Sequence, residues 1–340
     1  MEKVEAILYG SRWKGFLGFI ALICLLPFFI SSQYIFTLFI LIGIYCIVTI
    51  GLSLLIGYAG QISIGHAAFF GIGAYVSGVL TAKHDMSPWL AMGIGMIATF
   101  LIAYVIGMQV LKLKGHILAL ATIAINIIVY ILLVGLSDIT GGASGLIGIP
   151  NLSLFGLELG NQLHYYFLVW AFVFLVILFS TNIIRSNVGR VLRSIHDSEI
   201  GTETLGVNVT KYKIAIFALS AMYASLAGSL YAHYINFIAP PTFNVSFSIL
   251  LLVMVMVGGV HSIWGAMIGT AAIMFLNEVI RFVGHTVFNI SGEVEIVVYG
   301  LIIVVVMIFM PKGLIGVLDI RGKFAIKSAA KKNVASEKGV

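Results

Sequence analysis

The chain has 340 residues, of which 61% are hydrophobic and 9% are charged, and its mean hydropathy is +1.12. This composition excludes a soluble globular domain and indicates a polytopic membrane protein. The formal net charge of +6 comes from basic residues in loops beside apolar runs, without interleaved aromatic residues. We therefore expect the charge to reflect membrane topology and expect no nucleic-acid partner.

The first apolar run, residues 16–30, follows Arg12 and Lys14 and is followed at once by another apolar run. Because no small-residue cleavage site separates them, we expect a retained membrane helix rather than a signal peptide. The two cysteines, Cys24 and Cys46, both lie inside apolar runs and predict no disulfide framework.

Ten apolar windows are long enough to cross about 30 Å of hydrocarbon at about 1.5 Å per helical residue. They cover residues 15–31, 34–56, 62–82, 88–111, 117–136, 164–181, 214–236, 244–260, 263–283 and 293–310. The eighth is the weakest, because its uninterrupted core runs only from Phe247 to Val257. A re-entrant arm is the alternative to a full crossing there.

The distribution of lysine and arginine favours a full crossing. With ten crossings and a cytoplasmic N-terminus, only Lys83 and Arg281 lie outside, and the basic residues from Lys312 onward lie inside. We predict an all-α polytopic membrane protein of about ten transmembrane helices with both termini cytoplasmic. Residues 1–320 would form one transmembrane domain, and residues 321–340, which have little apolar content, a disordered cytoplasmic tail.

Three predicted helices carry small residues at helical spacing, which lets helix backbones approach closely in lipid. These are Ala67, Gly71, Ala74 and Gly78 in the third helix, Ser220, Ala224, Gly228 and Ala232 in the seventh, and Gly265 and Gly269 in the ninth. Tight packing is the simpler interpretation, and faces that slide or line a path are the alternative.

No Asp, Glu, Lys or Arg lies in the middle of a predicted span, although ion-driven carriers usually keep such groups at membrane depth. In the fifth span Asn126 follows Thr122 by one turn; an interhelical hydrogen bond is the simpler explanation of this pair, and ligand contact is the alternative. The chain has no G-x-x-x-x-G-K-[ST], H-E-x-x-H or G-x-S-x-G motif. We therefore expect no catalytic residue, metal site or bound cofactor in this chain.

Residues 182–213 form one long polar segment on the predicted cytoplasmic side. We expect a short amphipathic helix along the membrane surface, with an Arg193–Asp197 pair at i,i+4 spacing and with Glu199 and Glu203 presented to the cytosol. Gly206 would follow the helix end, and Thr210 would cap the seventh span. The broken apolar stripe of this helix consists of Val191, Leu192, Ile195 and, less strictly, Ile200.

The stretch EIGTETLGVNV at residues 199–209 resembles the degenerate EAA loop of ABC importer permeases, the coupling helix that docks on the ATPase subunit. Further resemblance lies in GLSLLIGYAGQISIGHAAFFGIGAYVSGVL, TGGASGLIGIP, YKIAIFALSAMYASLAGSLYAHYINFIAPPTF and SILLLVMVMVGGVHSIWGAMIGT. Together these stretches resemble the M-type permease of high-affinity branched-chain amino acid importers, over nearly everything from Gly51 to Gly316. The resemblance implies the ABC importer permease fold.

The resemblance assigns residues by position. Glu199, Glu203 and Gly206 match the coupling-helix residues, whereas Thr202 and Thr204 stand where the broader motif favours alanine, and the Leu-Pro that ends that motif is missing. The candidates for coupling to the ATPase are Arg193, Asp197, Glu199, Glu203, Leu205 and Gly206. The candidates for the translocation path or its gate are Gln61, Ser63, His66, Gly71, Asn126, Gly228 and Gly259. For His66, a structural hydrogen bond at a helix start and a gating role both remain open. The other matched positions are Gly65 beside His66, Gly258 and Gly265 in the late glycine turn, and Pro311 at the end of the last helix.

The resemblance also implies partners: a second homologous permease, two ATP-binding cassette subunits that use ATP, and a periplasmic or extracellular substrate-binding protein. It implies a bacterial or archaeal cytoplasmic (inner) membrane, with lipid around the helices. Outer acidic residues that could face a partner are Asp85, Asp138, Glu158, Glu293 and Glu295. The alternatives are a urea or short-chain amide permease, a stand-alone secondary carrier or channel, and, with no supporting motif, an intramembrane enzyme.

Overall fold

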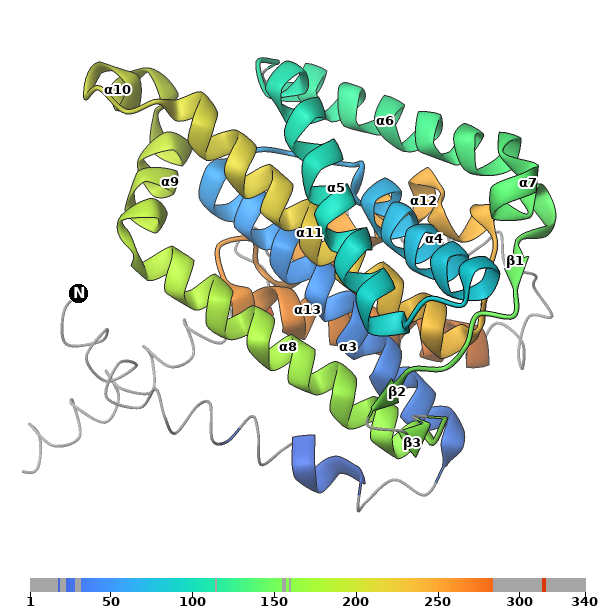
Figure 1. Ribbon diagram of the computed structural model, residues 1–340. Helices are drawn as coiled ribbons and strands as arrows, with labels where there is room; N and C mark the ends of the chain where they lie inside the picture. The colour runs from blue at the N-terminus through green and yellow to red at the C-terminus, as the bar shows by residue number, and fades with distance from the viewer. Residues whose placement is uncertain are drawn as a thin grey trace, which may run out of the picture.

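The computed structural model describes residues 18, 23–27, 32–113, 115–154, 157–158, 160–283 and 314–315. The predicted tail, the tenth predicted span and most of the first lie outside these residues. The described chain is almost entirely helical (Figure 1).

Six helices in the described part are long and apolar enough to cross a membrane. They are α3 with its π-helical extension η1 (Gln33–Ser53 and Leu54–Tyr58), α5 (Pro88–Val110), α6 (Gly115–Gly135), α8 (Gln162–Arg185), α11 (Val209–Ile235) and α13 (Ile263–Val283). Two further helices, α4 (His66–His84) and α12 (Val245–Gly258), pack among them. Each of the second to ninth predicted windows therefore contains a helix.

The short elements lie between the long helices. They are α7 (Ser137–Thr140), η2 (Gly142–Ser144), β1 (Leu146–Ile147), β2 (Ser153–Leu154), β3 (Leu157–Glu158), α9 (Asn187–Asp197), α10 (Glu199–Thr204), β4 (Phe237–Ile238) and η3 (Pro240–Phe243). Strand β1 pairs antiparallel with β4, with Leu146 opposite Ile238, and β2 pairs antiparallel with β3. The β1–β4 pairing holds the loop after α6 against the end of α11, whereas the β2–β3 pairing lies within that loop.

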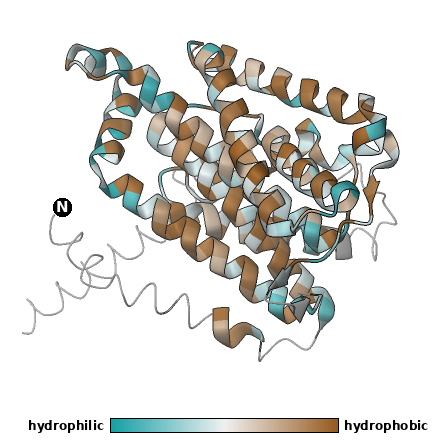
Figure 2. Cartoon of the chain, in the orientation of Figure 1, coloured by the Kyte–Doolittle hydropathy of each residue, from teal (hydrophilic) through white to brown (hydrophobic). Residues whose placement is uncertain are grey.

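The bundle has two chemically different ends. One end, which we call the basic end, carries Lys112, Arg185, Arg190, Arg193, Lys211 and Lys213 with helices α9 and α10. The opposite end carries Lys83, Arg281 and the β2–β3 pair. Figure 1 shows α9 and α10 far from β2 and β3, and Figure 2 shows hydrophobic residues along the long helices between these ends.

Helices α4 and α11 form the centre of the bundle because glycines let their backbones touch. A Cβ atom on Gly228 would lie 1.9 Å from the carbonyl oxygen of Phe70, and one on Gly73 would lie 2.3 Å from the carbonyl oxygen of Ser225. The predicted small-residue face of the seventh span is thus a packing face. Gly71 differs from expectation: a Cβ on Gly71 would lie 3.1 Å from Cβ and Cγ of Phe243 in η3, and Gly73, which the spacing argument missed, faces α11.

Helix α12 is a short helix that begins inside the bundle. Its 14 residues rise about 21 Å, short of about 30 Å of hydrocarbon. Asn244 caps its start by accepting from the Phe247 N–H at 3.0 Å. Its far end reaches the basic end, where Ser53 Oγ donates to the Val260 carbonyl at 2.8 Å. Helix α12 thus fills nearly all of the eighth predicted window, and β4 and η3 precede it on the side of the opposite end.

Candidate functional site: a buried network at two helix starts and a loop at the basic end

The helical structure is interrupted between η1 and α4, and glycines make this interruption possible. Gly60 has a positive φ of 66°. A Cβ on Gly57 would lie 2.0 Å from the Val260 carbonyl oxygen, and one on Gly65 would lie 2.6 Å from the Thr122 carbonyl oxygen. The end of η1 therefore packs on the loop after α12, and segment 59–65 passes between α6 and α9 to the start of α4 inside the bundle.

At this start six buried polar side chains form what we call the helix-start network: Ser63, His66, Thr122, Asn126, Ser220 and Ser248. His66 lies between two hydroxyls, with Nδ1 at 3.1 Å from Ser63 Oγ and Nε2 at 2.7 Å from Ser220 Oγ. A neutral imidazole, with one N–H and one acceptor nitrogen, fits both. His66 thus joins α4 to α11 well inside the protein.

The other half of the network joins α6 and α12 to the same helix start. Ser248 Oγ accepts from the Ala67 N–H at 3.0 Å, and Thr122 Oγ1 accepts from the Ile64 N–H at 2.9 Å. With its amide oriented to satisfy its neighbours, Asn126 accepts from the Ala68 N–H at 3.2 Å and from Ser248 Oγ at 3.0 Å. Asn126 therefore makes interhelical hydrogen bonds, as the simpler explanation of the sequence requires, and Thr122 bonds the segment just before α4.

The network lies deeper than the sequence suggested for His66. Its partner Ser220 follows Lys213 by seven residues along α11, which is about 10 Å along the helix axis. His66 itself is 1% exposed. Helices α4 and α12 both begin at this level, so two helix N-termini, each with a partial positive charge, meet inside the bundle.

Among the remaining path candidates, Gly228 lies in the α4–α11 contact and Gly259 ends α12 with a φ of 117°. The carbonyl oxygen of Gly259 lies 2.7 Å from the position of a Cβ on Gly265. Gln61 lies at the basic end of segment 59–65, where its Nε2 donates to the Ala59 carbonyl at 3.1 Å. The structure thus brings Ser63, His66 and Asn126 together and leaves Gly71, Gly228 and Gly259 in separate packing contacts.

The polar segment at the basic end forms two helices rather than the single one expected. Ser198 separates α9 from α10 and caps α10 by accepting from the Gly201 N–H at 3.1 Å. Leu192 and Ile195 of α9 are buried, as the stripe predicts, but Ile200 is 71% exposed. Gly206 follows α10 with a positive φ of 81°, as expected, whereas Asn208 and not Thr210 caps α11.

The expected Arg193–Asp197 pair does not form in this part of the described chain. Arg193 donates to the carbonyls of Gly189 and Ile184 at 3.2 and 3.3 Å, because α9 turns back on the end of α8. Asp197 lies 3.6 Å from His196 instead. Arg193 therefore stabilises the turn between α8 and α9.

The two glutamates of α10 have different environments, contrary to the expectation that both face the cytosol. Glu203 is exposed, whereas Glu199 forms an ion pair with Lys213 and accepts from Gln61 Nε2 at 3.4 Å. Thr202, where the broader motif favours alanine, is buried and bonds Ser194 Oγ at 2.7 Å. The large side chains on the outer surface of α10 are Ile200, Glu203 and, just after the helix, Leu205, which is 77% exposed.

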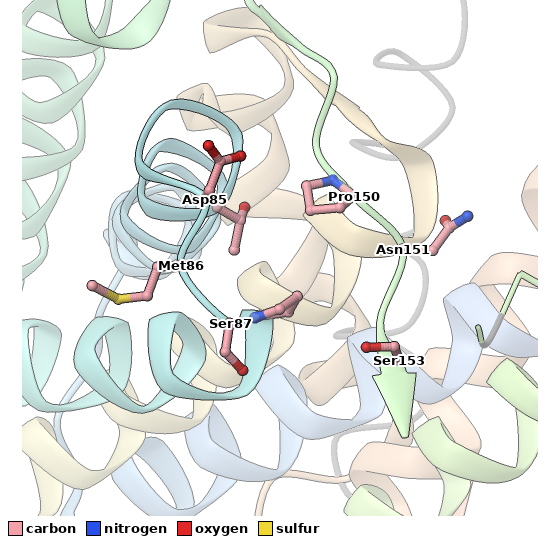
Figure 3. A pocket seen from close by; sticks show the side chains of 8 residues that line it. Asp85, Met86, Ser87, Pro150, Asn151 and Ser153 are labelled. Atoms are coloured by element: carbon pink, nitrogen blue, oxygen red, sulfur yellow. The ribbon is translucent and has the colours of Figure 1, made fainter. Parts of the chain in front are cut away.

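A polar pocket of about 460 Å³ opens at the opposite end between the α4–α5 turn and the segment before β2 (Figure 3). Asp85, Ser87 and Asn151 are among its lining residues. Asp85 ends α4 in a left-handed conformation, with a φ of 47°. Asp85 is one of the outer acidic residues expected to face a partner, and it lines this pocket.

The family model described as "Branched-chain amino acid transport system / permease component" matches residues 34–307. The chain belongs to this family. Among curated relatives of this permease, the high-affinity branched-chain amino acid transport system permease protein LivM of Escherichia coli is 28% identical over 95% of this chain and 80% of its own length. LivM of Salmonella typhimurium is 28% identical over 80% of this chain and 68% of its own length.

Relatives named LivH also match this permease. The high-affinity branched-chain amino acid transport system permease protein LivH of Salmonella typhimurium is 25% identical over 80% of this chain and 91% of its own length. No solved structure matches the chain significantly. The resemblance to M-type branched-chain amino acid ABC permeases seen in the sequence is confirmed by the family match and the LivM relatives.

The sequence argument missed several residues that the site uses. Ser248 contacts both α4 and α6 and was detectable as a polar residue in the eighth apolar window. Lys213 was counted only as a topology charge, although its side chain is 4% exposed. Its partner lies 14 residues earlier across two helix ends, and no local pattern indicates such a pairing.

Proposed function

We propose that this permease is a transmembrane subunit of an ATP-driven, binding-protein-dependent importer of branched-chain amino acids. Its neighbours would be a second homologous permease, two ATP-binding cassette subunits and a soluble substrate-binding protein. ATP would be used by the partner subunits, and this chain would bind no cofactor. The names of the LivM and LivH relatives support the substrate class and the second permease.

The orientation follows from charge. We assign the basic end to the cytoplasm of a bacterial or archaeal cell, because cytoplasmic loops are enriched in Lys and Arg. With the spans outside the described residues, the chain would cross the cytoplasmic membrane about ten times, with both termini inside. The pocket at Asp85 would then face the soluble substrate-binding protein.

The surface of α10 is the observation that carries the proposal. Ile200 and Leu205 are 71% and 77% exposed at the basic end, beside exposed Glu203, on a helix of six residues. Large apolar side chains exposed on a polar loop indicate a protein contact. We propose that this surface docks on an ATP-binding cassette subunit and receives the motion that ATP drives.

The path would run past the helix-start network. Discontinuous helices whose N-termini meet at membrane depth form substrate sites in many transporters, and α4 and α12 begin together there. We propose that reorientation of these two helices opens the path alternately to the two sides. An apolar path with few polar contacts suits leucine, isoleucine and valine.

A transport assay distinguishes the candidate substrates. Cells that lack their own branched-chain amino acid uptake, and that express this permease with its partners, should accumulate radiolabelled leucine and not urea. Urea accumulation without leucine uptake would be consistent with the proposed importer architecture but would contradict the proposed substrate class. Uptake of either solute by this chain alone would support a stand-alone carrier and contradict the importer.

A further inference from the structure

Lys213 is a buried lysine at the basic end, and docking of α10 on the ATPase does not explain its burial. Its side chain is 4% exposed, and lysines are almost never so buried unless they are paired. Its partner is Glu199, the first residue of α10, whose side chain is 26% exposed. The contact thus joins the helix proposed to dock on the ATPase to the base of the central helix α11.

The same carboxylate oxygen of Glu199 also contacts the segment that leads into α4. Gln61 Nε2 donates to Glu199 Oε1 at 3.4 Å and to the Ala59 carbonyl at 3.1 Å. Two residues later Ser63 contacts His66, which contacts Ser220 on α11. Glu199, Gln61, His66 and Lys213 therefore close a ring through α10, segment 59–65, the start of α4 and α11.

A ring of this kind couples motions. If α10 shifts while the ion pair holds, segment 59–65 and the start of α4 must shift with it, because packed interiors do not deform continuously. Replacing a buried ion pair by apolar residues of similar volume is often neutral or stabilising, so a gain in stability does not account for this pair. The best-attested use of buried ion pairs is to fix one arrangement of the elements that they join.

We propose that Lys213 is a positioning residue for coupling: through Glu199 and Gln61 it transmits displacement of α10 to the start of α4 and the helix-start network. Glu199 then acts inside the permease, and the ATPase contact is left to Ile200, Glu203 and Leu205. This inference rests on the proposed function, because coupling has meaning only if ATPases drive transport.

The test uses the complete complex reconstituted in liposomes, with leucine uptake and ATP hydrolysis measured in the same sample. We expect Lys213→Gln and Glu199→Gln each to lower leucine transported per ATP at least tenfold while binding-protein-stimulated hydrolysis continues. The exchanged double variant Glu199→Lys/Lys213→Glu should restore a large part of that ratio. Lys211→Gln removes the same charge from an exposed position two residues away and should leave the ratio unchanged.

The outcomes separate the possible failures. An unchanged ratio in both single variants would overturn the proposal, as would a reduced ratio that the exchanged double variant does not improve. If the single variants do not assemble, Gln61→Ala tests the proposal, because this variant keeps the Lys213–Glu199 ion pair. A decrease of at least threefold in leucine transported per ATP would support transmission through Gln61, and an unchanged ratio would overturn the proposal. Absence of ATP-driven uptake in the unmodified complex would instead overturn the proposed function.

Discussion

His66, Asn126 and Ser248 are polar side chains inside an otherwise apolar bundle, and each is paired in the structure. A buried polar group left without its partner costs about 1–3 kcal/mol. Four helices share these bonds, so the network fixes how α4, α6, α11 and α12 meet. We infer that its residues act together.

A double-mutant cycle tests this cooperation. Ser248→Ala should lower the free energy of unfolding by about 1–3 kcal/mol, because it leaves the Ala67 N–H and the Asn126 amide short of a partner. Combined with Asn126→Leu, the loss should be smaller than the sum by about 0.6 kcal/mol or more. SDS-denaturation of the purified permease measures both values, and strictly additive losses would contradict a shared network.

Gly228 offers a second test at the same scale. A Cβ there would lie 1.9 Å from a backbone oxygen of α4, which cannot move without shifting the helix. Gly228→Ala should therefore cost about 1–3 kcal/mol or more of stability. Gly93→Ala in α5 is the matched control, since no atom lies within 4 Å of its new Cβ. Equal denaturation midpoints for the two variants would refute the close contact.

The contrast between Glu199 and Glu203 shows where prediction from sequence stops at this scale. The spacing correctly placed both residues in one short helix, followed by Gly206. Which carboxylate turns inward depends on Lys213, which reaches Glu199 only after the chain has turned at Gly206 and entered α11. Gly73 was missed for a similar reason, because small-residue spacing does not give the rotation of a helix against its neighbour.

At the scale of elements, apolar length predicted eight helical segments in the described chain, because the cost of exposing backbone polar groups to lipid enforces helices. The same reasoning left open whether the eighth window crosses fully, and α12, with 14 residues, is too short to cross by itself. Hydropathy indicates that residues 244–260 lie in an apolar environment. It does not indicate that the first turn of α12 lies inside the bundle, where Ser248 contacts Ala67 of α4. The division of residues 187–204 into two helices could not be predicted, because a serine such as Ser198 is common both in polar loops and at helix N-caps.

The exposed surface of α10 yields a prediction at this scale. Ile200→Asp or Leu205→Asp should release the ATP-binding cassette subunits from the solubilised permease pair, because a charge replaces a large apolar side chain at the proposed contact. Co-purification of the subunits on a tagged permease measures this. Ile147→Asp alters an equally exposed residue at the opposite end and should retain them. Retention by all three variants would place the ATPase contact elsewhere.

At the scale of the whole molecule, α3 and α11 run antiparallel. Each leads through a connecting segment, residues 59–65 after η1 and residues 236–244 after α11, to a helix that begins within the bundle. Tyr234 near the end of α11 donates to Thr37 near the start of α3, at 3.0 Å. The other end of α3 meets the loop after α12 through Gly57 and His261, at 2.8 Å. The arrangement places the two helix starts, α4 and α12, at the centre of the molecule, between the docking loop and the opposite end.

The assignment of the basic end to the cytoplasm can be tested with single cysteines. In a background of Cys24→Ala and Cys46→Ala, a membrane-impermeant thiol reagent should label Asp85→Cys in intact cells. It should label Lys211→Cys only after the membrane is opened, because the two positions lie at opposite ends of the bundle. The reverse pattern of labelling would invert the molecule and separate α10 from any cytoplasmic ATPase.

The most direct measurement of the central claim is leucine accumulation in proteoliposomes that contain this permease, the second permease and both ATPase subunits, with binding protein outside and ATP inside. The account predicts uptake against a gradient that stops when ATP, the ATPase subunits or the binding protein is omitted. Accumulation that continues without ATP would show that the chain works as a carrier by itself, and α10 would then have no part in driving it.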